Sequence, residues 1–429
     1  MAKHGQERVG TGAGGGWLND PMHRAVHALG ITQITAWGTS FYCLGVLGNP
    51  IAKEMGWTRA QVFLGFTIAV LVMGLISTTV GRAIDRYGAR GLMSIGTVVV
   101  SAALAALAFV QDHASYLAVW ALLGVGMRLC LYDAAFAALV QVAPSRGRTA
   151  ISYLTLYGAF ASSIFWVIGH YLAEQVGWRQ TLLIFALVNL VICLPLHWFG
   201  LARRESASTA AMAPTAQAVA EGPALEGAAR RIGIGLFALI MSLNGFVFGI
   251  ITVQLVQLIE AAGLFTAAAV WMASLKGFAQ FAGRIVEIVF GRNLRAITVA
   301  RIAIGALPLS FLLLILGHGV FAAVLAFTLL LGAAQGVITI VRGAVPLALF
   351  GAKGYGAVLG LIATPVLFVN ASAPTVFAWI ADQWGWETGR YVLIGCAAAS
   401  WLAIEAMSFW YERHRRRITE PAMGADPRV

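Results

Sequence analysis

Apolar stretches of about 20 residues recur along this chain, separated by short loops that carry most of its charged residues. A helix of that length matches the hydrocarbon thickness of a bilayer. The chain is 59% hydrophobic and 11% charged, whereas a soluble domain carries about 25% charged residues. Lipid must therefore cover the apolar surface of this chain, which excludes a soluble protein. The net charge of +11 lies in loops and not along one helix face, so we expect no nucleic-acid partner.

The apolar pattern predicts an all-α polytopic membrane protein with twelve spans in two six-helix bundles. The expected spans are 27–49, 62–80, 92–111, 115–141, 150–172, 179–201, 233–258, 267–290, 302–318, 320–342, 356–380 and 389–411. The domains then follow as a tail (1–26), an N-terminal bundle (27–201), a linker (202–232), a C-terminal bundle (233–411) and a second tail (412–429). The linker is rich in Ala, Ser, Pro and Arg, a composition typical of flexible segments.

The basic residues are distributed unequally between the two sets of loops. One set, which includes both tails and the linker, holds most of the Lys and Arg residues. The loops on the other side hold only Lys53, Arg59, Arg179 and Arg390. The positive-inside rule therefore places the basic side and both termini in the cytoplasm. The Ala- and Gly-rich, Lys-poor composition favours a bacterial inner membrane.

The two halves repeat each other in sequence. GHYLAEQVGW at 169–178 aligns with FAWIADQWGW at 377–386, and the same offset superposes Leu-Leu-Gly at 122–124 on 330–332. The shared offset indicates an internal duplication. Because six spans separate equivalent positions, both copies have the same orientation in the membrane, which is typical of parallel transporter repeats.

The loop between the second and third spans reads Gly81-Arg82-Ala83-Ile84-Asp85-Arg86-Tyr87-Gly88-Ala89-Arg90. It resembles the cytoplasmic motif G-x-x-x-D-R-x-G-[RK]-[RK] of the major facilitator superfamily. Gly81, Asp85, Arg86, Gly88 and Arg90 match, while Ala89 stands where a basic residue is usual. Glycine permits tight turns and close helix approach, and Asp85 can face a helix N-terminus or an arginine of the other half. We therefore expect a gating contact here.

The segments Trp57-Thr58-Arg59-Ala60 and Gly177-Trp178-Arg179 look like the monocarboxylate-porter branch and its bacterial oxalate–formate relatives. That branch commonly has Asp-x-x-x-Arg in span 8, where the arginine binds the substrate carboxylate. Here the pattern is Gln280-x-x-x-Arg284. The resemblance implies that Arg284 is the anion ligand, and its planar fork suits a carboxylate. The family's proton-coupling aspartate is missing.

Ionisable residues at membrane depth are functional candidates because each is costly to leave unpaired. Lys276, Gln280 and Arg284 are spaced by four and share one helix face, which must look onto a cavity or a partner helix. Lys276 either supplies a second cation for a dicarboxylate or pairs with Asp133. Asp133 is either the proton carrier or a structural counter-ion. Its separation of five from Arg128 is poor for a pair on one helix face.

The remaining polar residues of the spans are expected to lie either at the membrane interface or along the substrate cavity. We expect Arg342 to extend to the interface, Glu405 to pack near the interface, and His170 and His197 to be interfacial. In the resembling fold, spans 1, 4, 7 and 10 line the cavity, and we expect their polar and aromatic residues to bind substrate together with Asn370 of span 11. These residues are Gln33, Trp37, Arg128, Tyr132, Asn244 and Gln335.

The sequence therefore predicts a secondary transporter of small organic anions, most simply monocarboxylates, working by alternating access as a monomer. A proton or a counter-anion would be the coupled species. The alternatives are a drug or metalloid exporter of the same fold and a membrane receptor or assembly subunit that transports nothing. Span 5 lacks the Gly-Pro pair of proton-coupled drug exporters. The four cysteines lie in apolar spans without CxxC spacing, and no nucleotide, metal or nucleophile motif predicts a cofactor or an enzyme.

Overall fold

A computed structural model describes residues 20–201 and 223–423, and every regular element in these residues is a helix. Eight helical stretches are long and apolar enough to cross a membrane. Two of them, 144–200 and 355–415, contain two spans each because the chain reverses inside them at Gly177 and Gly385. A broken first span and α13 (Thr266–Phe290) complete the predicted twelve.

The first half contains the helices of spans 1 to 6. They are α1 (Pro21–Ala36), η2 (Trp37–Phe41), α2 (Leu44–Met55), α3 (Arg59–Tyr87), α4 (Ala89–Leu107), α5 (His113–Cys130), α6 (Tyr132–Val142), η3 (Pro144–Arg146), α7 (Gly147–Gly158), α8 (Ala161–Val188), η4 (Asn189–Cys193) and α9 (Leu194–Gly200). The second half contains α12 (Gly227–Glu260), α13, η5 (Gly291–Asn293), α14 (Ala296–Leu316), α15 (Phe321–Phe350) and α16 (Tyr355–Met423).

The internal duplication is visible in the backbone. Gly177 has φ 81° and ψ 164°, and Gly385, its equivalent at the predicted offset, has φ 81° and ψ 160°. Both values lie in a region that glycine adopts far more easily than other residues. The aligned Gln-x-Gly-Trp sequences therefore make the same turn between the last two spans of each half.

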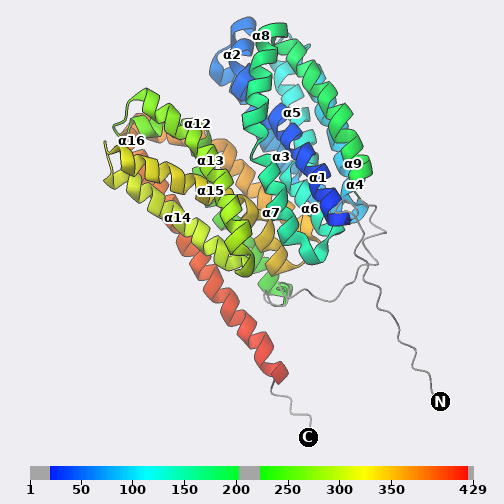
Figure 1. The fold of residues 1–429 in the computed structure, drawn as a ribbon, viewed down its shortest axis with the longest axis vertical. Helices are drawn as coiled ribbons and strands as arrows, with labels where there is room; N and C mark the ends of the chain where they lie inside the picture. The colour runs from blue at the N-terminus through cyan, green and yellow to red at the C-terminus, as the bar shows by residue number, and fades with distance from the viewer. Residues whose placement is uncertain (1–19, 202–222, 424–429) are drawn as a thin grey trace, which may run out of the picture.

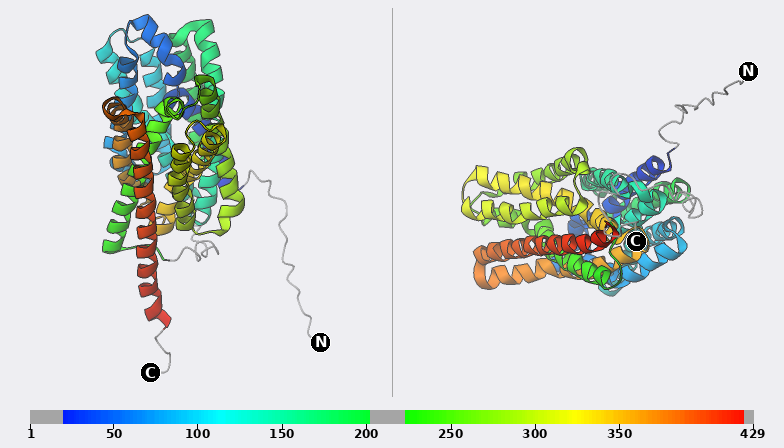
Figure 2. Two further views of the ribbon diagram at one scale, coloured as in Figure 1. Left: turned by 90° about the vertical axis from the view of Figure 1, so that its left-hand side faces the viewer. Right: turned by 90° about the horizontal axis from the view of Figure 1, so that it is seen from below.

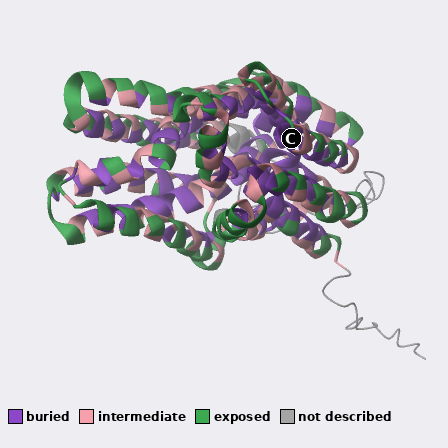
Figure 3. Ribbon diagram, turned by 90° about the horizontal axis from the view of Figure 1, so that it is seen from above, coloured by how far each residue is buried: buried purple, intermediate pink, exposed green. Residues whose placement is uncertain are grey.

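The two halves lie side by side, and α1 begins and α16 ends towards the same end of the molecule (Figures 1 and 2). The halves are in contact near the chain termini and diverge towards the end that carries α2. Within each half, buried residues occupy the faces that helices turn to one another, whereas exposed residues cover the outer faces (Figure 3). The outer faces are the apolar surface that lipid covers.

Several helices extend beyond the predicted spans, among them α12 and α16 at the linker and the C-terminal tail. α12 begins at Gly227, ahead of the expected start at 233, because its first turns accommodate Arg230 and Arg231 outside the apolar segment. Leu225, just before it, is buried and donates its backbone N–H to the Leu349 carbonyl at 2.7 Å. α16 continues past 411 to Met423. The expected linker residues 202–222 lie outside the described part.

Candidate substrate site and the contacts that close one end

Span 4 is broken in the middle of the membrane. Leu131 has extended backbone angles (φ −79°, ψ −171°), so α5 ends at Cys130 and α6 starts at Tyr132. Gln33 donates to the Cys130 carbonyl at 2.8 Å and thereby gives a partner to a backbone group next to the break. The break places Asp133 in the first turn of α6, where the helix dipole favours a negative charge.

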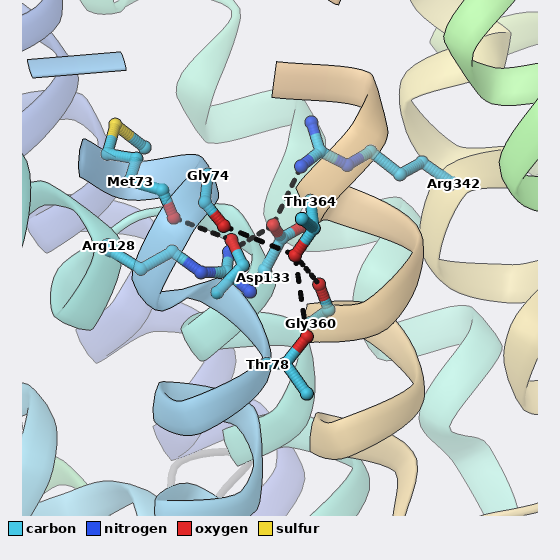
Figure 4. Close-up of polar contacts among 9 residues, drawn as sticks. Met73, Gly74, Thr78, Arg128, Asp133, Arg342, Gly360 and Thr364 are labelled. Carbon is cyan, nitrogen blue, oxygen red and sulfur yellow. Dashed lines mark hydrogen bonds and ion pairs between the residues drawn. The ribbon is translucent and has the colours of Figure 1, made fainter. Parts of the chain in front are cut away.

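Asp133 joins two arginines, one from each half of the molecule (Figure 4). Arg128 Nη1 donates to Asp133 Oδ2, and Arg342 Nη2 of α15 donates to the same oxygen at 2.7 Å. Arg128 and Asp133 are 4% and 5% exposed. The expectation that Arg342 extends to the interface is wrong, because Asp133 attracts it inward. The objection to an Arg128–Asp133 pair also fails, since the break at Leu131 changes the helix register.

The stripe on α13 faces the boundary between the halves. Arg284 Nη1 donates to the carbonyl of Thr155, in the opposite half, at 2.8 Å, and Arg284 Nε lies 3.4 Å from the Gly336 carbonyl. One turn away, Gln280 Nε2 donates to Gln335 Oε1 at 3.3 Å. The predicted stripe therefore lies against α15 and α7 and not against lipid.

Lys276, the third residue of the stripe, lies with its ammonium 5.9 Å from the centre of the Phe248 ring. It is partly exposed and has no ion pair within the described residues. The alternative that Lys276 pairs with Asp133 is wrong, because the ion pairs of Asp133 are with Arg128 and Arg342, both through Oδ2. Lys276 thus remains a cation without an anionic partner in this part of the molecule.

Aromatic residues of spans 1 and 4 pack against one another. Span 1 widens into the π-helix η2, a feature often found at functional sites. The Trp37 ring lies 5.1 Å from the Tyr132 ring and 5.8 Å from the Tyr42 ring. Sequence reasoning selected Trp37 and Tyr132 but missed Tyr42, which no spacing rule singles out.

Three residues that were predicted to bind substrate make hydrogen bonds within their own halves. Gln33 is fully buried and, besides its bond to Cys130, accepts from Trp37 Nε1 at 3.0 Å. Asn244 donates to Ser400 Oγ at 2.6 Å, and Asn370 donates to the Gly245 carbonyl at 3.1 Å. These amides connect neighbouring spans, so we do not include them in the proposed site.

Asp85 makes the contact that its motif suggests. Its two carboxylate oxygens accept from the backbone N–H groups of Gly356 and Ala357 at 2.9 and 2.7 Å. These are the first N–H groups of α16, the positive end of a helix dipole in the opposite half. Gly81 and Gly356 lack side chains where their backbones meet, and a Cβ on Gly356 would lie 2.8 Å from the Gly81 carbonyl oxygen. We call this contact the Asp85 cap.

The rest of the motif holds the loop in place. Gly88 has φ 86°, which ends α3 and starts α4. Arg86 lies over the Tyr87 ring at 5.2 Å, and Arg90 lies over the Trp198 ring at 4.5 Å. Gln141 accepts from the Ala89 N–H and donates to the Ile84 carbonyl, both at 3.0 Å. The loop is therefore attached to spans 4 and 6 of its own half.

A second polar contact joins the halves on the other side of the boundary. Arg148 Nη2 donates to Glu287 Oε1 at 3.2 Å and to the Gly291 carbonyl at 2.9 Å, while Nη1 donates to the Leu294 carbonyl at 2.6 Å. Ser152 Oγ donates to Glu287 Oε2 at 2.9 Å. We call this contact the Glu287 clasp.

Sequence reasoning missed this clasp, although a signal was present. Gly81-Arg82-x-x-Asp85 is repeated as Gly283-Arg284-x-x-Glu287. The two acids lie at equivalent places in the halves, and each binds the start of a helix region in the opposite half.

Between these contacts, spans 2 and 11 meet through small residues (Figure 4). Thr364 Oγ1 donates to the carbonyls of Gly360 and Gly74 at 3.1 and 3.2 Å, and it lies 3.4 Å from Thr78 Oγ1. Small residues allow this close approach of helices within a membrane.

One histidine expectation is wrong. His197 is fully buried between Thr97 Oγ1 at 2.8 Å and Thr32 Oγ1 at 3.0 Å, so it is a core residue and not an interfacial one. His170 is exposed and lies 3.3 Å from Glu174. Glu405 pairs with Arg301 at 2.6 Å. This pair lies at the end of the molecule that carries most of the basic loops, which we call the basic end.

Residues 29–317 match the family model of the Major Facilitator Superfamily. No curated protein matches the chain in sequence. Among solved structures, the human organic anion transporter MFSD10 (TETRAN) is similar with a TM-score of 0.71 and 16% identity, over 90% of this chain and 99% of that one.

Two further structures share the fold. The proton:xylose symporter XylE, bound to 6-bromo-6-deoxy-D-glucose, has a TM-score of 0.70 and 13% identity over 90% of this chain and 95% of its own. FucP in the outward conformation has a TM-score of 0.64 and 13% identity over 90% of this chain and 99% of its own. Because the family model spans well over half of the sequence, the chain belongs to the Major Facilitator Superfamily of membrane transporters.

Proposed function

We propose that this protein is a secondary transporter of small organic anions that are held through a carboxylate, with monocarboxylates as the simplest substrates. One observation carries the proposal. Arg284 lies at the boundary between the halves, and within the described residues its Nη2 group has no hydrogen-bond partner. A guanidinium with an open edge suits a carboxylate better than a neutral solute.

The basic loops orient the protein in the membrane. By the positive-inside rule the end that carries the Asp85 cap and the Glu287 clasp faces the cytoplasm, and we propose a bacterial inner membrane as its location. All hydrogen bonds and ion pairs between the halves, within the described residues, lie between mid-depth and this end. This arrangement supports an outward-facing state of an alternating-access cycle.

Asp133 is our proposed coupling residue. It is bound by Arg128 of its own half and by Arg342 of the other half. Separation of the halves at the basic end would remove Arg342 and leave one cation beside the carboxylate. A coupled proton would then take the place of Arg342, so proton movement and access would be linked through one residue.

The proposal is tested by carboxylate uptake into proteoliposomes that contain the purified protein. Arg284→Ala should abolish uptake while leaving expression and thermal stability close to wild type, and Arg284→Lys should restore little because the bidentate fork is lost. Near-normal carboxylate uptake by the alanine variant would remove Arg284 from the site. Uptake of cationic drugs or arsenite in place of carboxylates would favour the exporter alternative.

A further inference from the structure

In the candidate site, unpaired side-chain donors outnumber unpaired acceptors. Within the described residues, the donors that make no hydrogen bond include Lys276 Nζ, Arg284 Nη2 and the buried Gln335 Nε2. Asp133 Oδ2 accepts from two arginines while its Oδ1 has no partner, and Glu287 is bound by Arg148 and Ser152, so both acids are already balanced in charge. A ligand that fits this lining carries acceptors at more than one position and no ammonium group.

The two cations are too far apart to bind one carboxylate together. Lys276 and Arg284 are eight residues apart on one straight helix, so their Cα atoms are separated by about 12 Å. Both side chains lean towards the N-terminus of α13, which keeps this separation roughly unchanged at their charged ends. A charge-assisted hydrogen bond of about 2.8 Å at each end leaves roughly 6 Å between two ligand oxygens.

We infer that the site takes a dianion whose carboxylates are several bonds apart, with one carboxylate on Arg284 and the other on Lys276. An extended dicarboxylate of roughly four to six carbons spans this gap. Oxalate, whose carboxylates are directly bonded, does not reach both cations. Gln335 accepts from Gln280 midway along the stripe, and its Nε2 donor is unpaired, so it can donate to a ligand held between the two cations.

This inference rests on the proposed function. It adds that the substrate has a second negative charge and a defined distance between its two carboxylates. The test measures equilibrium binding to the full-length protein in nanodiscs, with acetate, butyrate and hexanoate compared with oxalate, succinate, glutarate and adipate. Succinate or glutarate should bind about tenfold to a hundredfold more tightly than butyrate, which is the value of one hydrogen bond between charged groups. Aspartate, which carries an ammonium group, should bind more weakly than succinate.

Substitution of Lys276 isolates the second charge. Lys276→Gln should remove the preference for succinate over butyrate, Lys276→Arg should keep most of it, and the exposed Lys53→Gln serves as the matched control. A dianion preference that survives in Lys276→Gln, or that peaks at oxalate, overturns the inference while leaving Arg284 as the carboxylate ligand. Failure of every carboxylate to bind wild type overturns the proposed function as well.

Discussion

The two ends of the molecule differ in how the halves are connected. At the basic end, the Asp85 cap, the Glu287 clasp and the Asp133–Arg342 pair cross the boundary. At the opposite end, the polar contacts stay within one half, as when Glu54 accepts from Trp178 and Arg179 at 2.7 and 2.8 Å. In the alternating-access cycle that we propose, the polar contacts between the halves select one access state, whereas those within a half maintain its shape.

The largest expected effect comes from the most buried crossing contact. Asp133→Asn leaves Arg128 and Arg342 without an anion, and an uncompensated buried charge costs about 3–5 kcal/mol. We expect a clear fall in thermal stability and an opening of the basic end, detected by thiol labelling of a cysteine placed beside Arg342. The exposed Asp382→Asn is the control. In proteoliposomes, the variant should also lose accumulation driven by an inward pH gradient, and accumulation that persists clears Asp133 of the coupling role.

The Glu287 clasp should come next. Glu287→Gln keeps the shape but removes the charge that Arg148 faces, and hydrogen bonds to charged groups contribute about 1.5–3 kcal/mol. We expect faster labelling at the basic end. A double-mutant cycle with Arg148→Met, read from labelling rates, should show strong coupling between the two positions. Independent, additive effects would mean that the clasp does not hold the halves together.

The Asp85 cap should have a smaller effect. Asn at position 85 retains one acceptor for the α16 N–H groups but loses its interaction with the helix dipole, which contributes about 1 kcal/mol. Asp85→Asn should slow turnover and change equilibrium affinity little, because the residue biases the access equilibrium without contacting ligand. Uptake kinetics and binding measured on the same preparation separate the two quantities. A large loss of affinity with normal turnover would contradict this assignment.

The smallest effect is expected at the opposite end. Arg179 donates to Glu54 and holds the pKa of that carboxyl below its ordinary value of 4.5. A lowered folded pKa stabilises the fold above the unfolded pKa, and this stabilisation is lost as pH falls through the folded value. Because Glu54 is largely exposed, Glu54→Gln should cost only about 0.5 kcal/mol. Labelling at the basic end should stay at the wild-type rate, and a changed rate would break the distinction between the two ends.

The fold could be predicted because bilayer thickness fixes the length of every span. The repeated Gln-x-Gly-Trp, from which the duplication was predicted, corresponds to matching turns at Gly177 and Gly385. The contacts between the halves were harder to predict from the sequence, because their partners are far apart along the chain. Arg148 and Glu287 are 139 residues apart, and Asp133 and Arg342 are 209 residues apart. Helical spacing relates residues on one helix and carries no information on which spans meet.

The break in span 4 gave no sequence signal either, because neither Gly nor Pro stands at Leu131. This single extended residue brings Asp133 back towards Arg128. The α13 stripe was found because spacings of four place Lys276, Gln280 and Arg284 on one face. Its partners, Thr155 of the opposite half and Gln335 of the same half, became apparent only from the packing of the helices.

The central claim is that one end of the molecule closes as the other opens. Distances between the two halves, measured at both ends, test it. In a variant without the native cysteines, one spin-label pair at positions 87 and 353 reports the basic end, and another at 174 and 387 reports the opposite end. Mutation of Asp85 and Glu287 together should lengthen the first distance and shorten the second in the same fraction of molecules. If both distances lengthen, or if only one changes, the halves do not exchange access and the account is wrong.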